Sequence, residues 1–467
     1  MAFINPNGND FDQYRKLVDS VTESMLEHLT DAYNKRTVPI HEVSFMESLP
    51  RIGIPSAQIV EGLQRVIEQS INVANPKYMG HMDSVPTLIS CAGEFVSSLL
   101  NNNMLSIEMS PIFSKMETQV IKEIASFFGY DESSGGVMLS GGSLANLEAL
   151  AVARNHAFSS LHKGLHSLEK QPVIFTSEAA HTSIQKAAML LGLGTDAVIP
   201  ISVNEDSQMD VKDLDQRIRS ASKEGKAPFA IVATAGTTVT GSVDPILQIS
   251  EIARRHNLWL HVDAAYGGAL IFSNKHKNLL NGIENANSIT FNPQKWMYIA
   301  KTCAMVLFKN GEILEQNFRI TAPYMNDTVT TNIGEISVQG TRHAEILKLW
   351  LSLQQIGTAG YGQLIDHGLK MMELYRDEIK RRPYLQLSSK PQTNIICFRG
   401  ISGGVPESLD NWNYRLQQHL IQEGNIFLSL PTYRGNRWLR AVLLNPFLNE
   451  DIILEVFDHI DNFYKRT

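Results

Sequence analysis

The stretch LWLHVDAAYGGA at residues 258–269 decides the fold, because an apolar run ends there in a single acidic residue. LWLHV has the length and composition of a buried strand, and Asp263 stands at its carboxyl end. Similar short apolar runs lie on both sides of it: PVIFTS at 172–177, APFAIVATA at 227–235, SITFN at 288–292 and CAMVLF at 303–308. Segments with helical apolar spacing, such as PILQISEIARRH at 245–256, separate them. This alternation predicts an α/β fold with a mostly parallel sheet and crossover helices.

The flanks of this region have a different pattern. Residues 10–70 carry helical apolar spacing, and after residue 350 strand-like TNIICFR and WLRAVLL lie among helices. At 467 residues, the chain exceeds the roughly 250–300 residues at which a single core stops growing. We therefore predict an N-terminal helical segment over 1–85, a large domain over 86–350 and a small α+β domain over 351–467.

The composition excludes several classes of protein. A formal net charge of −7 gives no overall attraction to nucleic acid or anionic lipid, so small-molecule chemistry is favoured. No apolar run approaches the roughly 20 residues that span a bilayer, and the N-terminus lacks the pattern of a signal peptide, so we expect a cytoplasmic protein. The three cysteines, Cys91, Cys303 and Cys397, are far apart, which indicates neither a disulfide framework nor a thiolate metal site.

A candidate phosphate-binding turn lies in GGVMLSGGSLANLEALAVAR at 135–154. A strand-like run meets Gly141, Gly142 and Ser143, and a helix follows. Glycines let a phosphate approach the backbone, Ser143 offers a hydroxyl and an amide, and the helix N-terminus adds a favourable dipole. A simple helix cap explains the same residues.

Two further strand ends carry a carboxylate and an amine. A buried Asp263 needs a partner, and one candidate is the protonated pyridine nitrogen of pyridoxal 5'-phosphate (PLP), while Ala265 is small enough to lie against a flat ring. Lys295 follows SITFNPQ and precedes Trp296, a setting that lowers the pKa of a lysine and lets it attack an aldehyde. Taken alone, Asp263 is a loop cap and Lys295 a surface charge. The order of turn, aspartate and lysine favours a PLP site.

Other polar residues follow strands of the same sheet. His181, in FTSEAAHTSIQ, lies where an imidazole stacks on a cofactor ring, although capping of the next helix explains it equally well. Thr237 and Thr238, in VATAGTTVTG, offer hydroxyls to the ring's phenolic oxygen, and turn formation is the alternative.

These motifs make the chain resemble the group II PLP-dependent amino-acid decarboxylases, which act on aromatic, acidic and diamino acids. The resemblance runs from PKYMGHM and NNNMLSIEMSP through RHAEILKLWLSLQQIGTAGY to WLRAVLLNP, nearly the whole chain. It implies the fold type I, aspartate-aminotransferase-like architecture with a seven-stranded sheet. It also implies Gly142 and Ser143 at the phosphate, His181 on the ring, Thr238 on the phenolic side, Asp263 at the pyridine nitrogen and Lys295 as the Schiff-base lysine.

The resemblance implies further site residues. Tyr324, in RITAPYMNDTVTT, matches the loop tyrosine that protonates the substrate carbanion, although a buried tyrosine with a hydrogen-bond partner is the alternative. Arg440 matches an arginine that serves a carboxylate, and Asn292 and Gln294 are expected at the cofactor. The expected substrate-binding residues are Tyr78, His81, Leu105, Thr341 and Arg440. Their mix, together with Met104, favours an aromatic or diamino acid, and no metal is expected.

Two departures and two alternatives accompany the resemblance. Gln294 replaces a usual histidine, so it can donate to phosphate but has no titratable proton, and Leu144 stands where an acid is common. The family implies a homodimer with shared active sites, wrapped by the N-terminal segment. The alternatives are an aldehyde-forming or eliminating homologue, in which phenylalanine replaces the loop tyrosine, and a non-catalytic PLP-binding homologue.

Overall fold

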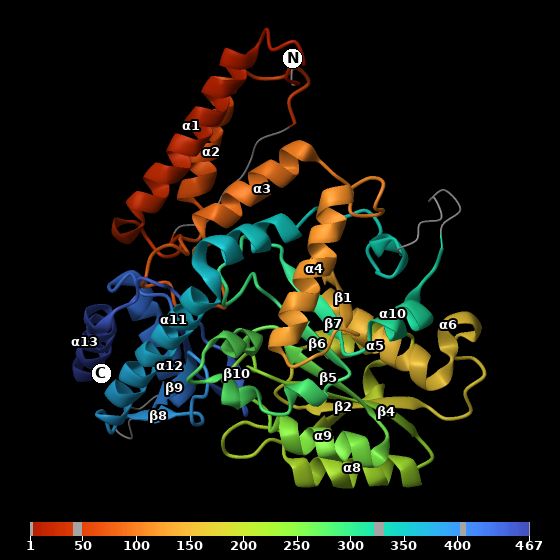
Figure 1. The fold of residues 1–467 in the computed structure, drawn as a ribbon. Helices are drawn as coiled ribbons and strands as arrows, with labels where there is room; N and C mark the ends of the chain where they lie inside the picture. The colour runs from red at the N-terminus through yellow and green to blue at the C-terminus, as the bar shows by residue number, and fades with distance from the viewer. Residues whose placement is uncertain (1–2, 41–48, 322–330, 402–407, 467) are drawn as a thin grey trace.

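The structure is a computed structural model that describes residues 3–40, 49–321, 331–401 and 408–466. At its centre is a seven-stranded sheet in the order β1-β7-β6-β5-β4-β2-β3, in which only β7 runs antiparallel to its neighbours (Figure 1). The strands are β1 (Gly135–Leu139), β2 (Pro172–Ser177), β3 (Val198–Ile201), β4 (Ala227–Thr234), β5 (Trp259–Ala264), β6 (Ser288–Phe291) and β7 (Ala304–Phe308). The predicted α/β class and mostly parallel seven-stranded sheet are confirmed.

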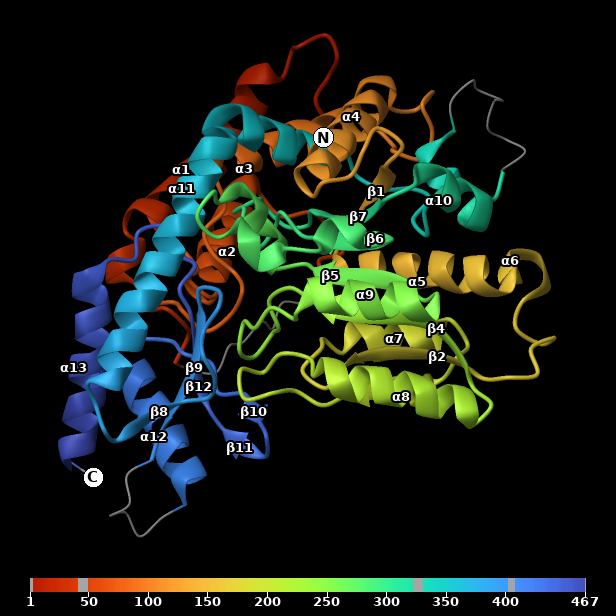
Figure 2. The same ribbon diagram turned by 60° about the horizontal axis from the view of Figure 1, so that its bottom comes forward.

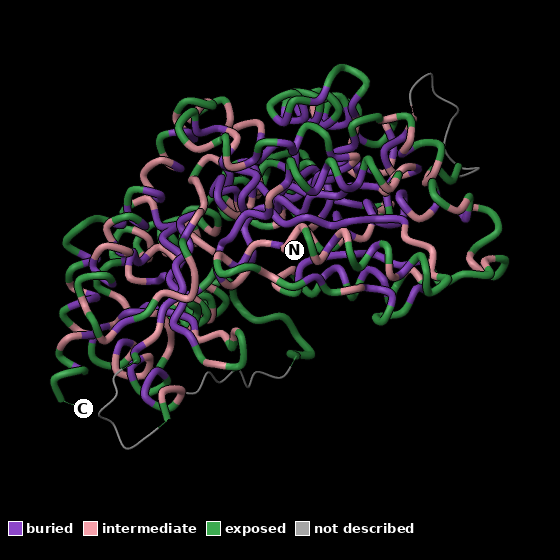
Figure 3. Tube along the Cα trace, turned by 90° about the horizontal axis from the view of Figure 1, so that it is seen from below, coloured by how far each residue is buried: buried purple, intermediate pink, exposed green. Residues whose placement is uncertain are grey.

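Helices cover both faces of this sheet. Helices α5 and α7 pack together on one face and α8 and α9 on the other, as right-handed crossovers require. These elements are α4 (Pro111–Phe127), α5 (Gly142–Phe158), α6 (Ser160–Lys163), α7 (Ser183–Leu190), α8 (Val211–Lys223), α9 (Ile246–His256) and α10 (Gly311–Phe318). Every residue of β2, β5, β6 and β7 is buried, and Figure 3 shows the buried core running along the sheet. This two-sided burial explains why the strands read as continuous apolar runs.

The N-terminal helices stand apart from the sheet. Helix α1 (Phe11–Thr30) packs on α2 (Ser56–Glu68), and the pair projects from the body of the molecule (Figure 1). Helix α3 (Leu88–Leu100) lies along α11 (Ile346–Lys380). None of the helices in the described ranges has the length and apolar character needed to cross a membrane.

The C-terminal part is a separate small layer beside the large sheet (Figure 2). It contains the antiparallel sheet β12-β9-β8 and a hairpin of β10 and β11, packed with α11, α12 and α13. Its elements are β8 (Leu385–Leu387), β9 (Ile395–Gly400), α12 (Leu409–Gln422), β10 (Thr432–Tyr433), β11 (Asn436–Arg437), β12 (Leu439–Val442) and α13 (Glu450–Arg466). The boundary expected at residue 350 falls inside α11, seven residues before that helix departs from helical geometry at Gly357.

Candidate active site

A cavity of about 440 Å³ lies where the carboxyl ends of β4, β5 and β6 meet the start of α5. All nine residues expected at the cofactor line it: Gly142, Ser143, His181, Thr238, Asp263, Ala265, Asn292, Gln294 and Lys295. Open α/β sheets place their ligands at this edge, because crossover connections leave a crevice there.

The turn before α5 forms one wall of the cavity. The Ser143 amide, at the helix N-terminus, has no hydrogen-bond acceptor among the residues that the structure describes, so it is available to an anion. A Cβ on Gly142 would come within 2.8 Å of the Asn292 amide, so a larger residue there would displace the Asn292 side chain. With its amide turned to satisfy both neighbours, Asn292 donates to the Phe291 carbonyl and accepts from the Gly142 amide at 3.3 Å, which braces the turn.

Asp263 and Lys295 face the same cavity. Asp263 is 6% exposed, and its Oδ2 and Oδ1 accept hydrogen bonds from Asn146 Nδ2 at 2.9 Å and from the Ala265 amide at 3.2 Å. Burial lowers the pKa of Lys295, while the nearby Asp263 opposes that shift. A lysine in this setting is more readily a neutral nucleophile than one on the surface.

His181 lines the cavity and also caps a helix. Its Nδ1 accepts a hydrogen bond from the Ser183 amide at 3.2 Å, at the start of α7. Burial lowers the pKa of His181, which favours the neutral ring. Capping of α7 by His181 is therefore compatible with the expected stacking of its ring on a cofactor.

The two threonines after β4 differ. Thr237 Oγ1 bonds to Thr240 Oγ1 at 2.8 Å and accepts from the Ser242 amide, so it forms the turn. Thr238 lines the cavity. Gln294 is oriented by the Cys303 amide, which donates to its Oε1 at 2.5 Å, and Gln294 Nε2 has no acceptor within the described residues. That nitrogen can therefore donate into the cavity.

Three of the expected substrate-binding residues lie close together; none of them lines the cavity, but Arg440 bonds to Thr238, which does. Arg440, which is 6% exposed, donates to the carbonyl oxygens of Thr238 and Gly80 and lies 3.1 Å from His81 Nδ1. Tyr78 stacks on Phe427 with ring centroids 5.3 Å apart, and burial raises the pKa of Tyr78 to about 12. Burial also lowers the pKa of Arg440.

The other two expected substrate-binding residues lie together elsewhere. Thr341 Oγ1 accepts from Asn103 Nδ2 at 3.2 Å, and Leu105 packs against Gly334. Neither lines the cavity. Tyr324 lies outside the described residues.

Sequence reasoning missed several residues of the site. Asn146, Ser183, Thr234 and Tyr266 also line the cavity, and His261 lies behind it. A signal was present for His261, because it stands two residues before Asp263 and so on the same face of β5. Thr234 Oγ1 is buried without a partner in the described part of the chain.

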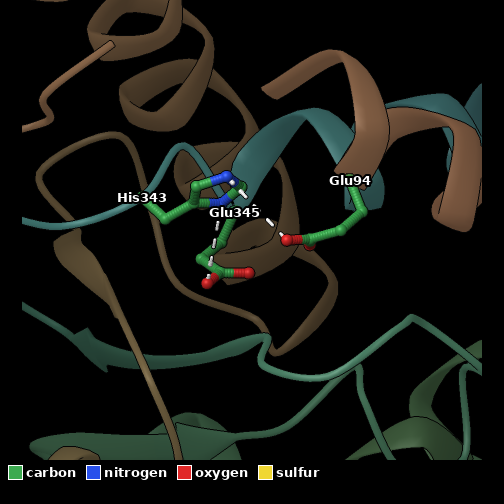
Figure 4. A group of neighbouring side chains, drawn as sticks. All are labelled: Glu94, His343 and Glu345. Carbon is green, nitrogen blue, oxygen red and sulfur yellow. Dashed lines mark ion pairs between the residues drawn. The ribbon is translucent and has the colours of Figure 1, made fainter. Parts of the chain in front are cut away.

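A second cluster of titratable groups lies between α3 and α11. The side chains of Glu94, His343 and Glu345 gather at one place (Figure 4), and their ligand atoms lie within 4.8 Å of one another. The fully buried Lys348 fills the same space, since its Nζ lies 2.5 Å from Glu94, pairs with Glu345 and donates to the Thr302 carbonyl. An ammonium group therefore already balances these carboxylates.

The residues of the cavity fit PLP. A free amide at a helix N-terminus suits its phosphate, a buried carboxylate suits its ring nitrogen, and a lysine with a lowered pKa suits its aldehyde. These groups line one cavity, as a ligand that carries a phosphate, a ring nitrogen and an aldehyde requires.

Comparisons with known proteins agree with this chemistry. A family model described as the pyridoxal-dependent decarboxylase conserved domain matches residues 39–401. GADL1 of Bos taurus, an acidic amino acid decarboxylase, is 30% identical over 426 residues, which cover 88% of this chain and 81% of that protein.

Solved structures show the same architecture. Mouse CSAD in its apo form has a TM-score of 0.90 at 28% identity, with 97% of this chain and 99% of that chain covered. The glutamate decarboxylase domain of a diaminobutyrate-pyruvate transaminase and L-2,4-diaminobutyrate decarboxylase from Vibrio parahaemolyticus has a TM-score of 0.85 at 25% identity. This match covers 100% of the present chain and 98% of the Vibrio parahaemolyticus chain.

Proposed function

This chain belongs to the pyridoxal-dependent decarboxylase family, and from that premise we propose that the 440 Å³ cavity at the carboxyl ends of β4–β6 is its active site. The protein is a PLP-dependent amino-acid decarboxylase with the fold of the type I PLP enzymes. The observation that carries the assignment of the site is the meeting of Ser143, Asp263 and Lys295 in one cavity.

We assign the cofactor-binding roles by position in the cavity. Gly142, Ser143 and Gln294 bind the phosphate, and Asn292 braces that turn. Asp263 holds the proton of the ring nitrogen, His181 and Ala265 flank the ring, and Thr238 lies on its phenolic side. When bound, PLP accepts the electrons that the substrate's α-carbon retains as carbon dioxide leaves.

Lys295 is the residue that we propose holds the cofactor covalently. Borohydride reduction of the holoenzyme followed by peptide mass mapping should place a pyridoxyl group on Lys295. Lys295→Ala should lose the label, and its activity should fall at least about a thousandfold, since the covalent attachment of the cofactor is removed. Lys301→Ala, at an exposed lysine in the same segment, is the control and should keep the label. A label that stays elsewhere in Lys295→Ala contradicts the assignment.

We propose that Tyr324 is the proton donor of the reaction. Its hydroxyl supplies the proton that replaces carbon dioxide at the α-carbon, so the product is an amine. Tyr324→Phe should lower amine formation and give aldehyde with consumption of oxygen. Amine formation at the wild-type rate by Tyr324→Phe contradicts this role and leaves the proton to another group.

Arg440 is proposed to face a carboxylate of the substrate. Its guanidinium is buried, and its hydrogen bonds in the described residues go to neutral acceptors, so a carboxylate would be its first anionic partner. Arg440→Lys keeps the charge but loses the fork geometry, and KM should rise more than kcat falls. An unchanged KM contradicts this contact.

For the side chain of the substrate we favour an aromatic or diamino acid, supported by the stacked pair of Tyr78 and Phe427 with His81 beside it. The relatives are named for acidic and diamino substrates. Carbon dioxide release should be measured with aromatic acids, 2,4-diaminobutyrate, ornithine, glutamate and cysteine sulfinate. Release from the acidic amino acids alone overturns the preference.

We also propose a homodimer. Helix α3 buries the small residues Ser90, Gly93 and Ser97 and exposes Phe95, Leu99 and other large apolar side chains. Beside it, α1, α2 and the start of α3 line an apolar cavity of about 920 Å³. An exposed apolar surface of this extent is typical of a subunit interface.

Shared active sites follow from the same proposal. Leu105 and Thr341 lie away from their own chain's cavity, so we assign them to the site of the neighbouring subunit. Mixing Lys295→Ala with Leu105→Asp subunits should restore part of the activity, because one site of the mixed dimer has both native residues. If mixed dimers recover no activity, the active sites are not shared.

We also propose a cytoplasmic location, which is supported by three unpaired cysteines. Cell fractionation tests this location.

A further inference from the structure

Behind Asp263 lies a row of buried hydrogen bonds that the proposed mechanism does not use. Trp259 Nε1 donates to Ser288 Oγ at 2.9 Å, and Ser288 Oγ lies 2.8 Å from His261 Nδ1. His261 Nε2 lies 3.0 Å from Asn146 Oδ1, and Asn146 Nδ2 donates to Asp263 Oδ2 at 2.9 Å. Asn146 is 1% exposed, and His261 and Ser288 are fully buried.

Elementary donor and acceptor rules fix the direction of this row. A carboxylate oxygen without a hydrogen can only accept, so Asn146 turns Nδ2 to Asp263 and Oδ1 to His261 Nε2. Burial lowers the pKa of His261 to about 4, so its ring is neutral and carries one hydrogen, on Nε2. That hydrogen is donated to Asn146 Oδ1, because the other neighbour, Thr290 Oγ1, is 3.4 Å away. His261 Nδ1 therefore accepts from Ser288 Oγ, which in turn accepts from the Trp259 indole N–H.

Every hydrogen bond in the row therefore points toward the carboxylate of Asp263. Donors of this kind hold a carboxylate in one orientation, and each polarised link strengthens the next in a buried site. A carboxylate also accepts more than one hydrogen bond, so Asp263 keeps capacity on the side that lines the cavity.

Asn146 also bonds to a second residue that lines the cavity, Ser183. Its Nδ2 donates to Ser183 Oγ at 2.9 Å, and the Ser183 amide donates to His181 Nδ1. The two hydrogens of one amide thus tie Asp263 to the segment that carries His181.

We propose that Asn146 and His261 are positioning residues that hold the carboxylate of Asp263 in place and aimed at the ring nitrogen of the cofactor. The proposal rests on the proposed function, in which Asp263 holds the proton of that nitrogen. It assigns roles to two residues that do not themselves carry out the reaction. The row that begins at Trp259 contains residues of three elements, α5, β5 and β6, and together they orient Asp263.

A cofactor analogue tests this directly. Apo-protein would be titrated with PLP and with an analogue in which a C–H group replaces the ring nitrogen. In Asn146→Leu and His261→Phe, affinity for PLP should fall about tenfold or more, as for the loss of a charge-assisted contact, while affinity for the analogue changes by less than about twofold. The ¹⁵N shift of labelled PLP should show a loss of the ring-nitrogen proton.

Two further variants complete the design. Asn155→Leu removes another buried asparagine amide from the same helix and should leave the ratio of the two affinities unchanged. Asn146→Asp keeps the shape of the side chain if the leucine variant does not fold, and it should also lose the preference for PLP, because two carboxylates then share one proton.

The outcomes separate the two proposals. Equal losses of affinity for PLP and for the analogue in the Asn146 and His261 variants overturn the positioning role, since they indicate a general structural effect. Wild-type protein that binds both compounds equally well instead overturns the role of Asp263 in the proposed function.

Discussion

At the scale of single residues, Glu148 is an acid that the fold keeps protonated. It lies fully buried on α5, and its Oε2 accepts from the Val338 amide at 3.0 Å and from Ser337 Oγ. Burial raises the pKa of Glu148 from 4.5 to about 8. Between pH 4.5 and about 8 the folded protein keeps a proton that the unfolded chain has already released. The stability that this group contributes therefore decreases as pH rises through that window.

Glu148→Gln should remove this pH dependence, because glutamine is neutral and has nearly the same shape. Urea unfolding of the apo-protein from pH 5.5 to 8 should show a decrease in the wild type of up to about 1.4 kcal/mol per pH unit from this group, and a flatter profile in the variant. Glu251→Gln, at an exposed position on α9, should follow the wild type. Identical slopes in wild type and Glu148→Gln would show that the carboxyl is already ionised in the folded state.

Much of the site could be predicted from the sequence at this scale. Ser143, Asp263 and Lys295 stand at strand or helix ends, so their order along the chain was enough to bring them together. Asn146 could not be assigned, because its partners His261 and Asp263 lie 115 and 117 residues away along the chain. A polar residue within an apolar run gives no sign of which distant group will satisfy it.

At the scale of elements, α11 combines two helical stretches across one irregular residue. Gly357 has φ 69° and ψ 164°, which is a conformation that only glycine adopts without strain. A Cβ at this position would meet no atom within 4 Å, so any cost of substitution comes from the backbone alone.

Gly357→Ala should lower the free energy of unfolding by about 1–3 kcal/mol, the usual cost of such a conformation in a residue with a Cβ. Gly62→Ala, inside α2 and with open space around it, should instead gain about 0.5–1 kcal/mol from its better helix propensity. Urea unfolding measures both. A stable Gly357→Ala protein would mean that α11 straightens there at no cost.

Helix α11 is also joined to α3 by the buried Lys348. Lys348→Met should cost about 3–5 kcal/mol, because Glu94 and Glu345 are left without their counter-charge. Lys370→Met changes an exposed lysine of the same helix and should stay within about 0.5 kcal/mol of the wild type. The comparison of the two in thermal unfolding isolates the buried charge, and equal midpoints would contradict its importance.

At the scale of the whole molecule, the alternation of short apolar runs and helical segments was sufficient to predict the large sheet. The small layer was predicted less sharply, because α11 passes through the expected boundary at residue 350 without a break in its apolar pattern. A helix that belongs to two layers has no compositional boundary to recognise.

The outward apolar face of α3 gives the prediction that belongs to this scale. Leu99 is 64% exposed, and Leu99→Glu should weaken a dimer about tenfold or more, because a charge replaces an apolar contact at the interface. Light scattering coupled to size exclusion should show the variant shifting toward the monomer on dilution. Leu190→Glu, at a leucine with 66% exposure on α7, should elute like the wild type. Equal masses for Leu99→Glu and wild type at all concentrations would place the interface elsewhere.

The pairing of β1 with β7 has a consequence for how the protein is made. β1 ends at Leu139, and the strand that pairs with it begins only at Ala304. At roughly 5–20 residues per second, the ribosome releases β1 about 8 to 30 seconds before its partner is available. The nascent chain carries an apolar strand with open backbone groups through that interval. The yield of native enzyme in a cell should therefore depend on chaperone capacity and on growth temperature.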